Sequence, residues 1–344
     1  MKISLQWISD YVDLPSDLKP EKLAYDLTMT TVEVEAVEKT SAAFDRMVIG
    51  RVDEVVPHPN AEKLSVATCS LGPGQTEEVV CGGANLVQGM TVAVALTGAT
   101  VTPKGGGSPV TIAPTRIRGV ESKVMICAAW EIGLGELFPG EKEGDILDLS
   151  GLDAPPGTPL AEALNLQDIV LDIDNKSLTN RPDLWGHYGI ARELAAIYRL
   201  PLKAPPSYDL ASLAEADRRV IIDDAECCRR YTATVLKGVQ PAESPLWLKS
   251  RLFLTGFRPI NLPVDLTNYV LMAVGQPSHA FDDTLLGRTI SIRKSQPEEK
   301  IGLLDGEELT LSDKDLVIAD ETGPVALAGV MGGDRSSIQE GTDG

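Results

Sequence analysis

The chain has 344 residues, of which 43% are apolar and 24% charged; this is ordinary globular composition, and the length favours two or three domains over a single core. No apolar run approaches the roughly 20 residues that a membrane span needs, and the N-terminus lacks the order of a signal peptide, so we expect no membrane partner. The net charge of −19 is spread along the whole chain and disfavours nucleic-acid binding through bulk electrostatics.

The cysteine and histidine content points away from metal and disulfide chemistry. The five cysteines show no CxxC spacing, and the three histidines lie in unrelated contexts. Neither pattern is that of a zinc site, so we expect no bound metal. An odd number of cysteines without a pairing pattern favours a reduced, cytoplasmic protein.

The first 40 residues predict two helices and one strand. Residues 3–12 place four apolar side chains on one helical face, and a second helix begins near Pro20, in "PEKLAYDLTMT". Residues 31–39, "TVEVEAVEK", alternate apolar and acidic residues, as a half-buried strand does. These elements are too few to close a core alone, so we expect a partner from elsewhere in the chain.

Residues 41–150 have a different character, with short β-type runs separated by turn signals. This spacing predicts a small Greek-key barrel, and an OB-fold is the first choice. The five expected strands lie at 47–56, 64–71, 77–83, 90–96 and 110–114.

After a Pro/Gly break, the pattern returns to that of the first 40 residues. The run "DIVLDIDN", at 168–175, predicts a strand with acids at alternate positions, and residues 180–200 predict a helix. We therefore expect 1–40 and 151–205 to form one discontinuous α/β domain. The segments 32–37 and 168–174 would share its sheet, and the barrel, an insertion, would leave and return at one edge.

Residues 211–344 predict an α+β domain. Strands are expected at 229–239, 289–295 and 315–320, with a hairpin turning at Asp305–Gly306. Further expected elements are helices at 244–256 and 265–275 and a strand at 324–333. The predicted fold class is thus α+β multidomain, with an OB-fold β-barrel inserted in a small α/β domain and followed by an α+β domain.

Two stretches of the barrel carry residues that could contact phosphates. In "PHPNAEKL", His58, Asn60 and Lys63 are explained more simply by a tight turn between strands. In "TRIRGVESKVMIC", Arg116, Arg118 and Lys123 lie close together in an acidic chain. A solvated strand edge explains these three at least as well as a phosphate site does.

The histidines and glycines further along also have structural explanations. His187, in "NRPDLWGHYGIARE", is more consistent with packing on a helix face than with ligand binding. His279 follows the Gly-x-Pro turn of "NYVLMAVGQPSHAFDD", and no Ser-His-Asp or Cys-His order surrounds it. The glycines of "GVMGG", at 329–333, allow close approach to the backbone or a β-bulge.

Taken together, three sets of motifs resemble one family. The stretch "GRVDEVVPHPNAEKLSVATC" is similar to the tRNA-binding OB-fold domain near the N-terminus of bacterial phenylalanyl-tRNA synthetase β subunits. The stretch "NRPDLWGHYGIARELAA" resembles the segment that closes their N-terminal domain. The stretches "LTNYVLMAVGQPSHAFD" and "ALAGVMGG" resemble their editing domain, and the resemblance runs in the family's order from residue 1 to 344.

The resemblance implies a function for each part. Residues 41–150 would bind tRNA-Phe, and residues 211–344 would be an editing domain, C-terminally truncated, that hydrolyses mischarged Tyr-tRNA-Phe. ATP and Mg²⁺ would serve the full enzyme through the separate α subunit, with no cofactor in this segment. The full enzyme would be a heterotetramer of two α and two β subunits.

The resemblance also implies roles for individual residues. The hydrolytic pocket would hold His279, Thr267 and Asn268, with His279 helping to place the terminal adenosine or the attacking water. Gly332, Ala328 and Gly329 would line the part of the pocket that takes the amino acid. The residues implied for tRNA contact are His58, Asn60, Lys63, Arg116, Arg118 and Lys123.

Two hypotheses for the function are consistent with the sequence, a hydrolytic enzyme and a non-enzymatic scaffold. A synthetic site shaped for phenylalanine rejects tyrosine by only about a hundredfold, so a second, hydrolytic site is physically reasonable. The alternative is a non-enzymatic scaffold that binds tRNA and docks the α subunit, because the chain ends before the family's pocket glutamate. Two stretches differ from the family's common motifs. At 226–231 the sequence is "ECCRRY", where the family usually has Cys-Pro before Arg-Tyr, and "DNKSLTNRPDLWGHYG" differs from the family's usual sequence after "NRPD".

Overall fold

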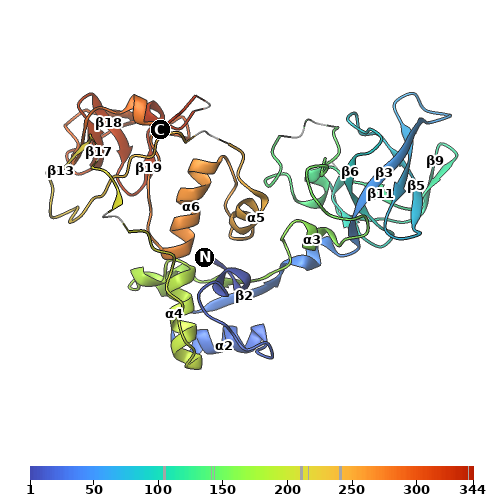
Figure 1. Ribbon diagram of the computed structural model, residues 1–344, viewed down its shortest axis with the longest axis horizontal. Coiled ribbons are helices and arrows are strands. Elements are labelled where there is room, and N and C mark those ends of the chain that lie inside the picture. Colours follow the sequence, from blue (N-terminus) through green and yellow to red (C-terminus); the bar gives the residue numbers. More distant parts are fainter. Residues whose placement is uncertain are drawn as a thin grey trace. The chain divides into compact units, whose positions relative to one another are not determined.

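The computed structural model describes residues 1–103, 106–140, 142, 144–209, 212–215, 217–239, 242–339 and 341–344. Its internal contacts define two compact units, residues 1–203 with 245–259 and residues 204–244 with 260–344 (Figure 1). Within the described residues, no helix is long and apolar enough to cross a membrane.

The N-terminal part of the first unit is built on a three-stranded antiparallel sheet. Its strands are β1 (Lys2–Ser4), β12 (Ile169–Ile173) and β2 (Val34–Lys39), in the order β1-β12-β2. The prediction that the two acidic, alternating segments share one sheet is therefore confirmed. Two details differ from the prediction. The first is that the chain returns from the barrel to β12, which is the central strand of the sheet and not an edge strand. In addition, every pairing is antiparallel, so this part is α+β and not α/β in the strict sense.

Helices α2 (Pro20–Thr30) and α4 (His187–Tyr198) form where the sequence predicts them. The expected helix at 3–12 is wrong in extent, since Ile3 lies on β1 and α1 covers only Leu5–Ile8. The cause is Ser4, the last residue of β1. Its hydroxyl accepts a hydrogen bond from the Trp7 N–H and caps the helix, which therefore begins at Leu5.

A buried polar cluster fixes this junction between strand and helix. The Ser4 hydroxyl donates to Asp168, and the Ser4 N–H donates to His187 Nε2 at 3.0 Å. The indole of Trp7 is fully buried and stacks on His187, with ring centroids 4.1 Å apart. Burial raises the pKa of Asp168, against the opposing effect of the hydrogen bonds from Ser4 and Gln6. The structural interpretation of His187 is thus confirmed.

The inserted part contains a five-stranded antiparallel sheet in the order β11-β6-β3-β4-β5. Its end strands β11 and β5 are in contact, so the sheet closes almost completely into a barrel. The strands are β3 (Met47–Pro57), β4 (Ser65–Ser70), β5 (Thr76–Cys81), β6 (Thr91–Ala95) and β11 (Met125–Ile126).

Four of the expected barrel strands are confirmed and the fifth is wrong. Residues 110–114 contain β8 (Val110–Thr111), which pairs with β7 (Thr100–Val101) in a separate hairpin. A second hairpin joins β9 (Thr115–Ile117) to β10 (Val120–Ser122). The true fifth strand, β11, is only two residues long and therefore shows no alternating pattern in the sequence.

One apolar core joins the base of the barrel to the three-stranded part. It includes Phe44 and Met47. Helix α3 (Leu160–Ala163) adds Leu160, and Leu164 follows directly after this helix. Helix α5 (Leu246–Leu254) contributes Leu254 to this core. The expectation that this helix belongs with residues 211–344 is wrong, because α5 packs with the first unit.

Polar contacts confirm where α5 packs. The Ser250 hydroxyl donates to the Leu164 carbonyl at 2.7 Å, and Arg251 pairs with Asp10 at 2.6 Å. Leu248 and Leu252 are fully buried, so the apolar face of this helix is the one that meets the core.

The second unit contains a five-stranded sheet in the order β13-β14-β17-β18-β19. The β13–β14 pair is parallel and the other pairs are antiparallel. The strands are β13 (Arg219–Ile222), β14 (Thr289–Lys294), β17 (Leu316–Asp320), β18 (Gly323–Leu327) and β19 (Met331–Gly332).

The hairpin predicted at Asp305–Gly306 is confirmed by the pairing of β15 (Lys300–Gly302) with β16 (Glu308–Thr310). Helix α6 (Leu262–Val274) covers the helix expected at 265–275. The strand expected at 229–239 is wrong, because the strand lies earlier, at β13. The 3₁₀ helices are η1 (Thr40–Phe44), η3 (Ala129–Ile132), η4 (Asn175–Leu178), η5 (Pro182–Leu184), η7 (Asp283–Leu285) and η8 (Asp334–Ser336).

Asp320, at the end of β17, is the polar anchor of this second sheet. Its buried carboxylate accepts hydrogen bonds from Arg335, from the Gly287 N–H at 3.0 Å and from the Thr322 N–H at 2.8 Å. Burial opposes ionisation of this carboxyl, but the hydrogen bonds outweigh it and hold the pKa well below the usual range.

We expect Asp320→Asn to reduce the free energy of unfolding at pH 7 by about 1–3 kcal/mol, because a charged acceptor of several hydrogen bonds is lost. A depressed pKa stabilises the fold above the unfolded value of 3.8, and this contribution is lost as the pH falls below it. The difference between parent and variant should therefore shrink below about pH 4. Denaturant unfolding across pH tests this, with the exposed Asp313→Asn as control; a difference independent of pH would contradict it.

Candidate nucleic-acid groove and hydrolytic site

The loop between β3 and β4 is locked to the β9–β10 turn by His58. The ring Nδ1 of His58 accepts from the Asn60 N–H at 3.0 Å, so the proton lies on Nε2, which donates to the Ile117 carbonyl at 3.2 Å. The Asn60 side-chain amide donates to the Arg118 carbonyl at 3.0 Å. His58 is 5% exposed, and it therefore holds the loop in place and does not present its ring to a ligand.

These contacts shape a groove of about 870 Å³ that Lys63 and Arg118 both line. Arg118 (φ 44°) and Gly119 (φ 99°) form the tight two-residue turn between β9 and β10. Both cationic side chains are exposed, and neither has an ion-pair partner among the residues that the structure describes. Their charges are available to a phosphate, and they come from segments more than 50 positions apart in the sequence.

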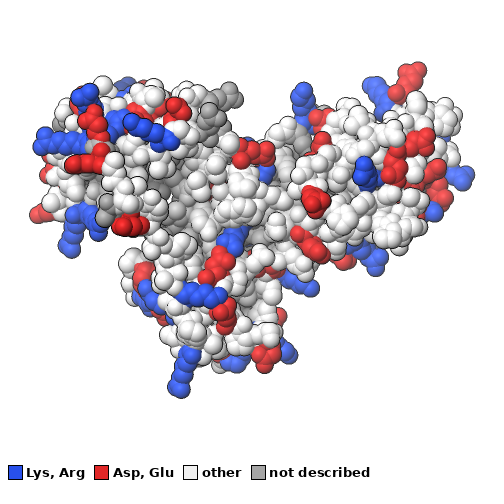
Figure 2. Space-filling model, in the orientation of Figure 1, with Lys and Arg blue, Asp and Glu red and all other residues white. Residues whose placement is uncertain are grey.

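The other basic residues singled out from the sequence are less available. Lys123 approaches Glu77 at 3.8 Å, and Arg116 lies directly across the β9–β10 ladder from Glu121. Figure 2 shows acidic and basic side chains intermixed over the visible face of the barrel, with no continuous basic surface. The groove between Lys63 and Arg118 is therefore the best candidate nucleic-acid contact.

In the second unit, His279 has the properties of a residue available for chemistry. The imidazole is half-buried and stacks on Phe281, with centroids 5.8 Å apart and planes 16° apart. It makes no hydrogen bond to any residue within the described part of the chain. Burial lowers its pKa, so the ring is neutral at pH 7 and can accept a hydrogen bond.

Helix α6 leads directly into the His279 loop. The Asn261 side chain caps its first turn by accepting from the Val264 N–H, and Gly275 ends it with φ 75°. Thr267 and Asn268 lie in its middle. The Thr267 hydroxyl donates to the Val264 carbonyl at 2.7 Å, and within the described residues neither side chain is hydrogen-bonded to His279.

The β18–β19 region lies near the same apolar cluster as the His279 loop. Ala328 and Phe281 both pack against this cluster, and His279 stacks on Phe281. Gly332 pairs with Ala326, and a Cβ atom there would meet first the Leu304 Cδ1 atom, at 3.0 Å. The cluster residues are Ile290, Ile292, Ile318, Val325 and Ala326.

Contacts thus relate His279 to Ala328 through Phe281 and the apolar cluster, whereas within the described residues no hydrogen bond joins Thr267 or Asn268 to His279. Gly329 is exposed with φ 72°. Sequence reasoning missed the part played by Phe281, whose ring supports the imidazole. The available signal was its position two residues after the histidine.

Comparison with known proteins places these features in context. Residues 47–159 match a family described as "Putative tRNA binding domain", and residues 227–344 match the "B3/4 domain". The chain therefore combines a tRNA-binding domain with a B3/4 domain, in that order.

The chain is also similar to proteins named phenylalanine–tRNA ligase beta subunit. The protein of that name from Anaeromyxobacter dehalogenans is 44% identical over 99% of this chain and 41% of its own length. The one from Coxiella burnetii is 39% identical over 100% of this chain and 41% of its own. The chain is thus related, over nearly its whole length, to the N-terminal portion of the beta subunit of an aminoacyl-tRNA ligase. It spans about 41% of the length of these relatives.

A solved structure titled as an N-terminal fragment of the phenylalanyl-tRNA synthetase beta subunit from Pyrococcus horikoshii is also similar. Its sequence identity is 17%, its TM-score is 0.29, and the match covers 56% of each chain. This likeness is too weak to define the fold.

We expect His58→Ala to loosen the groove without unfolding the barrel. The variant loses one hydrogen bond between the loop and β9 and one within the loop, which should lower the local opening free energy by about 1–3 kcal/mol. Amide exchange should accelerate at residues 58–64 and 117–119 and stay unchanged in β3 and β6. Glu62→Ala, in the same loop, is the matched control; equal exchange in both variants would show that His58 does not hold the groove.

Proposed function

We propose that this chain forms the N-terminal part of a phenylalanine–tRNA ligase beta subunit, supplying tRNA-Phe binding and hydrolytic editing of Tyr-tRNA-Phe. The barrel is an OB-fold that contacts the tRNA, and residues 211–344 carry the editing pocket. ATP and Mg²⁺ act in the α subunit, within a heterotetramer of two α and two β subunits. The observation that carries the proposal is the 44% identity to a phenylalanine–tRNA ligase beta subunit over 99% of the chain, which the ordered domain matches at residues 47–159 and 227–344 support.

The editing step is the hydrolysis of an ester. Neutral His279 accepts a hydrogen bond from a water molecule and so orients it toward the carbonyl carbon of the tyrosyl ester. The water oxygen attacks this carbon, the bond to the ribose oxygen breaks, and a proton passes to that oxygen to give the terminal hydroxyl and tyrosine. No activated serine or cysteine is needed, which agrees with the surroundings of His279.

The remaining pocket residues select tyrosine over phenylalanine as the amino acid to be hydrolysed from the tRNA. Gly332 and Gly329 carry no side chain and Ala328 only a methyl group, so this wall leaves room for an aromatic ring. Thr267 and Asn268 supply polar groups to the phenol or to the ribose hydroxyls. A site that hydrogen-bonds the phenol discriminates strongly against phenylalanine, which leaves those groups unpaired.

One observation favours the alternative, a scaffold that binds tRNA and docks the α subunit without hydrolysis. Within the described residues, no hydrogen bond links Thr267 or Asn268 to His279, so these polar groups are not joined into one network. Deacylation of Tyr-tRNA-Phe distinguishes the two functions directly.

In the full-length enzyme, we expect Gly332→Trp to reduce Tyr-tRNA-Phe deacylation to the spontaneous rate and to leave phenylalanine activation unchanged. The indole fills the space for the tyrosyl ring, and the exposed Leu304 side chain can move aside for it. Val330→Trp, at an exposed neighbouring position, is the matched control. Parent-like clearance by Gly332→Trp would refute the pocket assignment.

His279→Ala should cause a smaller loss, on the order of tenfold to a hundredfold, because ribose hydroxyls can share the placement of water. The parent rate should fall as pH decreases below the lowered pKa of His279, since the protonated ring no longer accepts a hydrogen bond. His279→Ala should lack this acid limb. A pH–rate profile with the same acid limb in both proteins would contradict the role of His279.

For the barrel, we expect weak tRNA binding with a steep salt dependence, because the chain is acidic and only a few cations are available. Lys63→Ala and Arg118→Ala should each reduce the slope of log K against log salt by about one. Lys123→Ala, whose partner is Glu77, should change it less. Tight, salt-insensitive binding would refute this mode of contact.

A further inference from the structure

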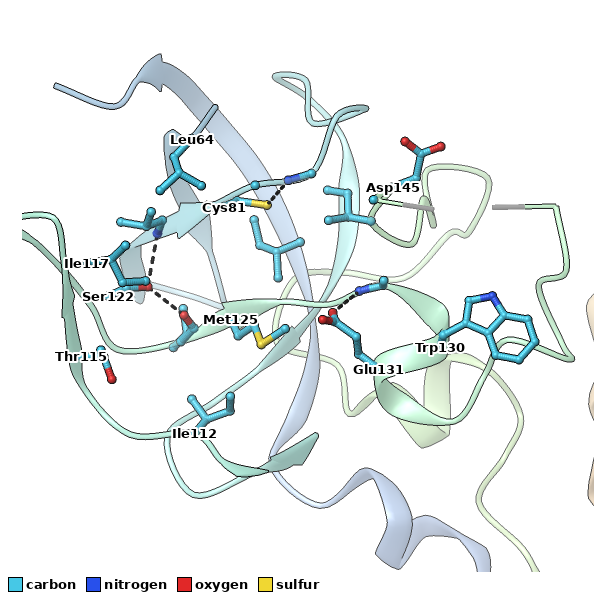
Figure 3. A pocket seen from close by; sticks show the side chains of 18 of the residues that line it. Leu64, Cys81, Ile112, Thr115, Ile117, Ser122, Met125, Trp130, Glu131 and Asp145 are labelled. Carbon is cyan, nitrogen blue, oxygen red and sulfur yellow. Dashed lines mark hydrogen bonds between the residues drawn. The ribbon is translucent and has the colours of Figure 1, made fainter. Parts of the chain in front are cut away.

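Beside the groove, the barrel contains a cavity of about 830 Å³ (Figure 3). Its walls come from β5, the β9–β10 hairpin, β11 and the segments around 128–131 and 144–146. Apolar side chains that line it include Leu64, Val80, Ile117, Met125 and Ile146. The cavity is therefore suited to a flat apolar group.

Most polar groups of the cavity are already used by the protein. The Ser122 hydroxyl accepts from the Val80 N–H and donates to the Val124 carbonyl. The Cys81 thiol accepts from the Gly83 N–H, and burial raises its pKa, so it stays uncharged.

Three charged side chains also line the cavity, those of Glu131, Lys142 and Asp145, and within the described residues only Glu131 is held in place by a hydrogen bond to the backbone. Its Oε2 atom accepts from the Ala128 N–H at 2.9 Å, which fixes the carboxylate in place, as Figure 3 shows. Within the described residues, the second carboxylate oxygen accepts no hydrogen bond from the protein. A fixed carboxylate oxygen in an apolar cavity is an acceptor for an N–H group of a ligand.

The cavity and the basic groove share walls. Leu64 lines both, and in the β9–β10 hairpin Ile117 lines the cavity while the next residue, Arg118, lines the groove. A nucleotide strand with phosphates near Lys63 and Arg118 therefore has a recess beside it for a base. The pairing of cations with an adjacent apolar recess matches the phosphate and base of a nucleotide.

We propose that this cavity binds one unpaired nucleobase of the bound RNA, and that Glu131 accepts a hydrogen bond from its exocyclic amino group. The inference rests on the proposed tRNA binding by the barrel. It gives a preference for cytosine over uracil, because cytosine presents an amino group where uracil presents a carbonyl oxygen. Salt dependence comes from the groove and base preference from the cavity.

The test uses the full 344-residue chain and short oligocytidine and oligouridine RNAs of equal length, measured by fluorescence anisotropy at several salt concentrations. The parent should bind oligocytidine about tenfold more tightly, as expected for one carboxylate–amino contact. Glu131→Gln should remove or reverse this preference, because its amide oxygen can keep the Ala128 contact while its NH₂ group faces the base. Glu136→Gln, at an exposed position outside the cavity, is the control and should behave as the parent.

A second variant separates the cavity from the groove. Ile117→Trp fills the cavity and should weaken binding of both RNAs by about tenfold or more without changing the salt slope. Lys63→Ala should reduce the salt slope and keep the preference for cytidine. Thr111→Trp, on the exposed β8 strand, is the matched bulky control.

The outcomes distinguish this inference from the proposed function. Equal binding of the two RNAs by the parent, or parent-like binding by a folded Ile117→Trp variant, would overturn the nucleobase site and leave RNA binding by the groove intact. Absence of salt-dependent RNA binding in the parent would overturn both. Loss of the cytidine preference in Glu131→Gln alone, with Glu136→Gln unchanged, would support the assignment.

Discussion

The pairing of β2 with β12 is the constraint on which the first unit depends. Strand β2 finds its partner only after the chain has completed the barrel, and the Ser4–Asp168 contact spans 164 positions. Such a long insertion is tolerated because closure entropy rises by only about 0.6 kcal/mol for each doubling of loop length. The pairing brings both ends of the barrel together, and the core around Phe44 and Leu160 then holds the barrel on the sheet.

The same logic operates on a smaller scale inside the barrel. The β9–β10 hairpin is tied to the loop after β3 by His58 and Asn60, and to β5 by the hydrogen bond from the Val80 N–H to Ser122. Once tied, it separates two environments, with Arg118 on the groove side and Ile117 on the cavity side. An acidic chain can in this way offer a local site for phosphates and bases, because two free cations and one apolar recess are held at fixed positions.

Sequence patterns predicted those features that depend on local periodicity. The alternation along β3, β4, β5 and β6 identified the barrel strands, and Pro20 marked the start of α2. The patterns failed where tertiary contacts decide. Strand β11 is too short to show a period, and the amphipathic pattern of α5 says which face is buried but not against which unit. Among the site residues, the locking role of His58 depends on a tautomer and on a partner nearly 60 positions away, which no local motif contains.

The two candidate sites use opposite physical principles, and this explains why they can occupy one acidic chain. In the proposed function, the barrel contacts RNA through Lys63 and Arg118, whose attraction to phosphates is weakened by salt. The proposed site at His279 instead uses a neutral imidazole, because burial lowers the pKa of that ring. A hydrolytic pocket of this kind needs no net positive field, because a neutral ring holds its water by a hydrogen bond. Affinity for RNA and hydrolysis would then depend on different residues in different compact units, so that either could change without the other.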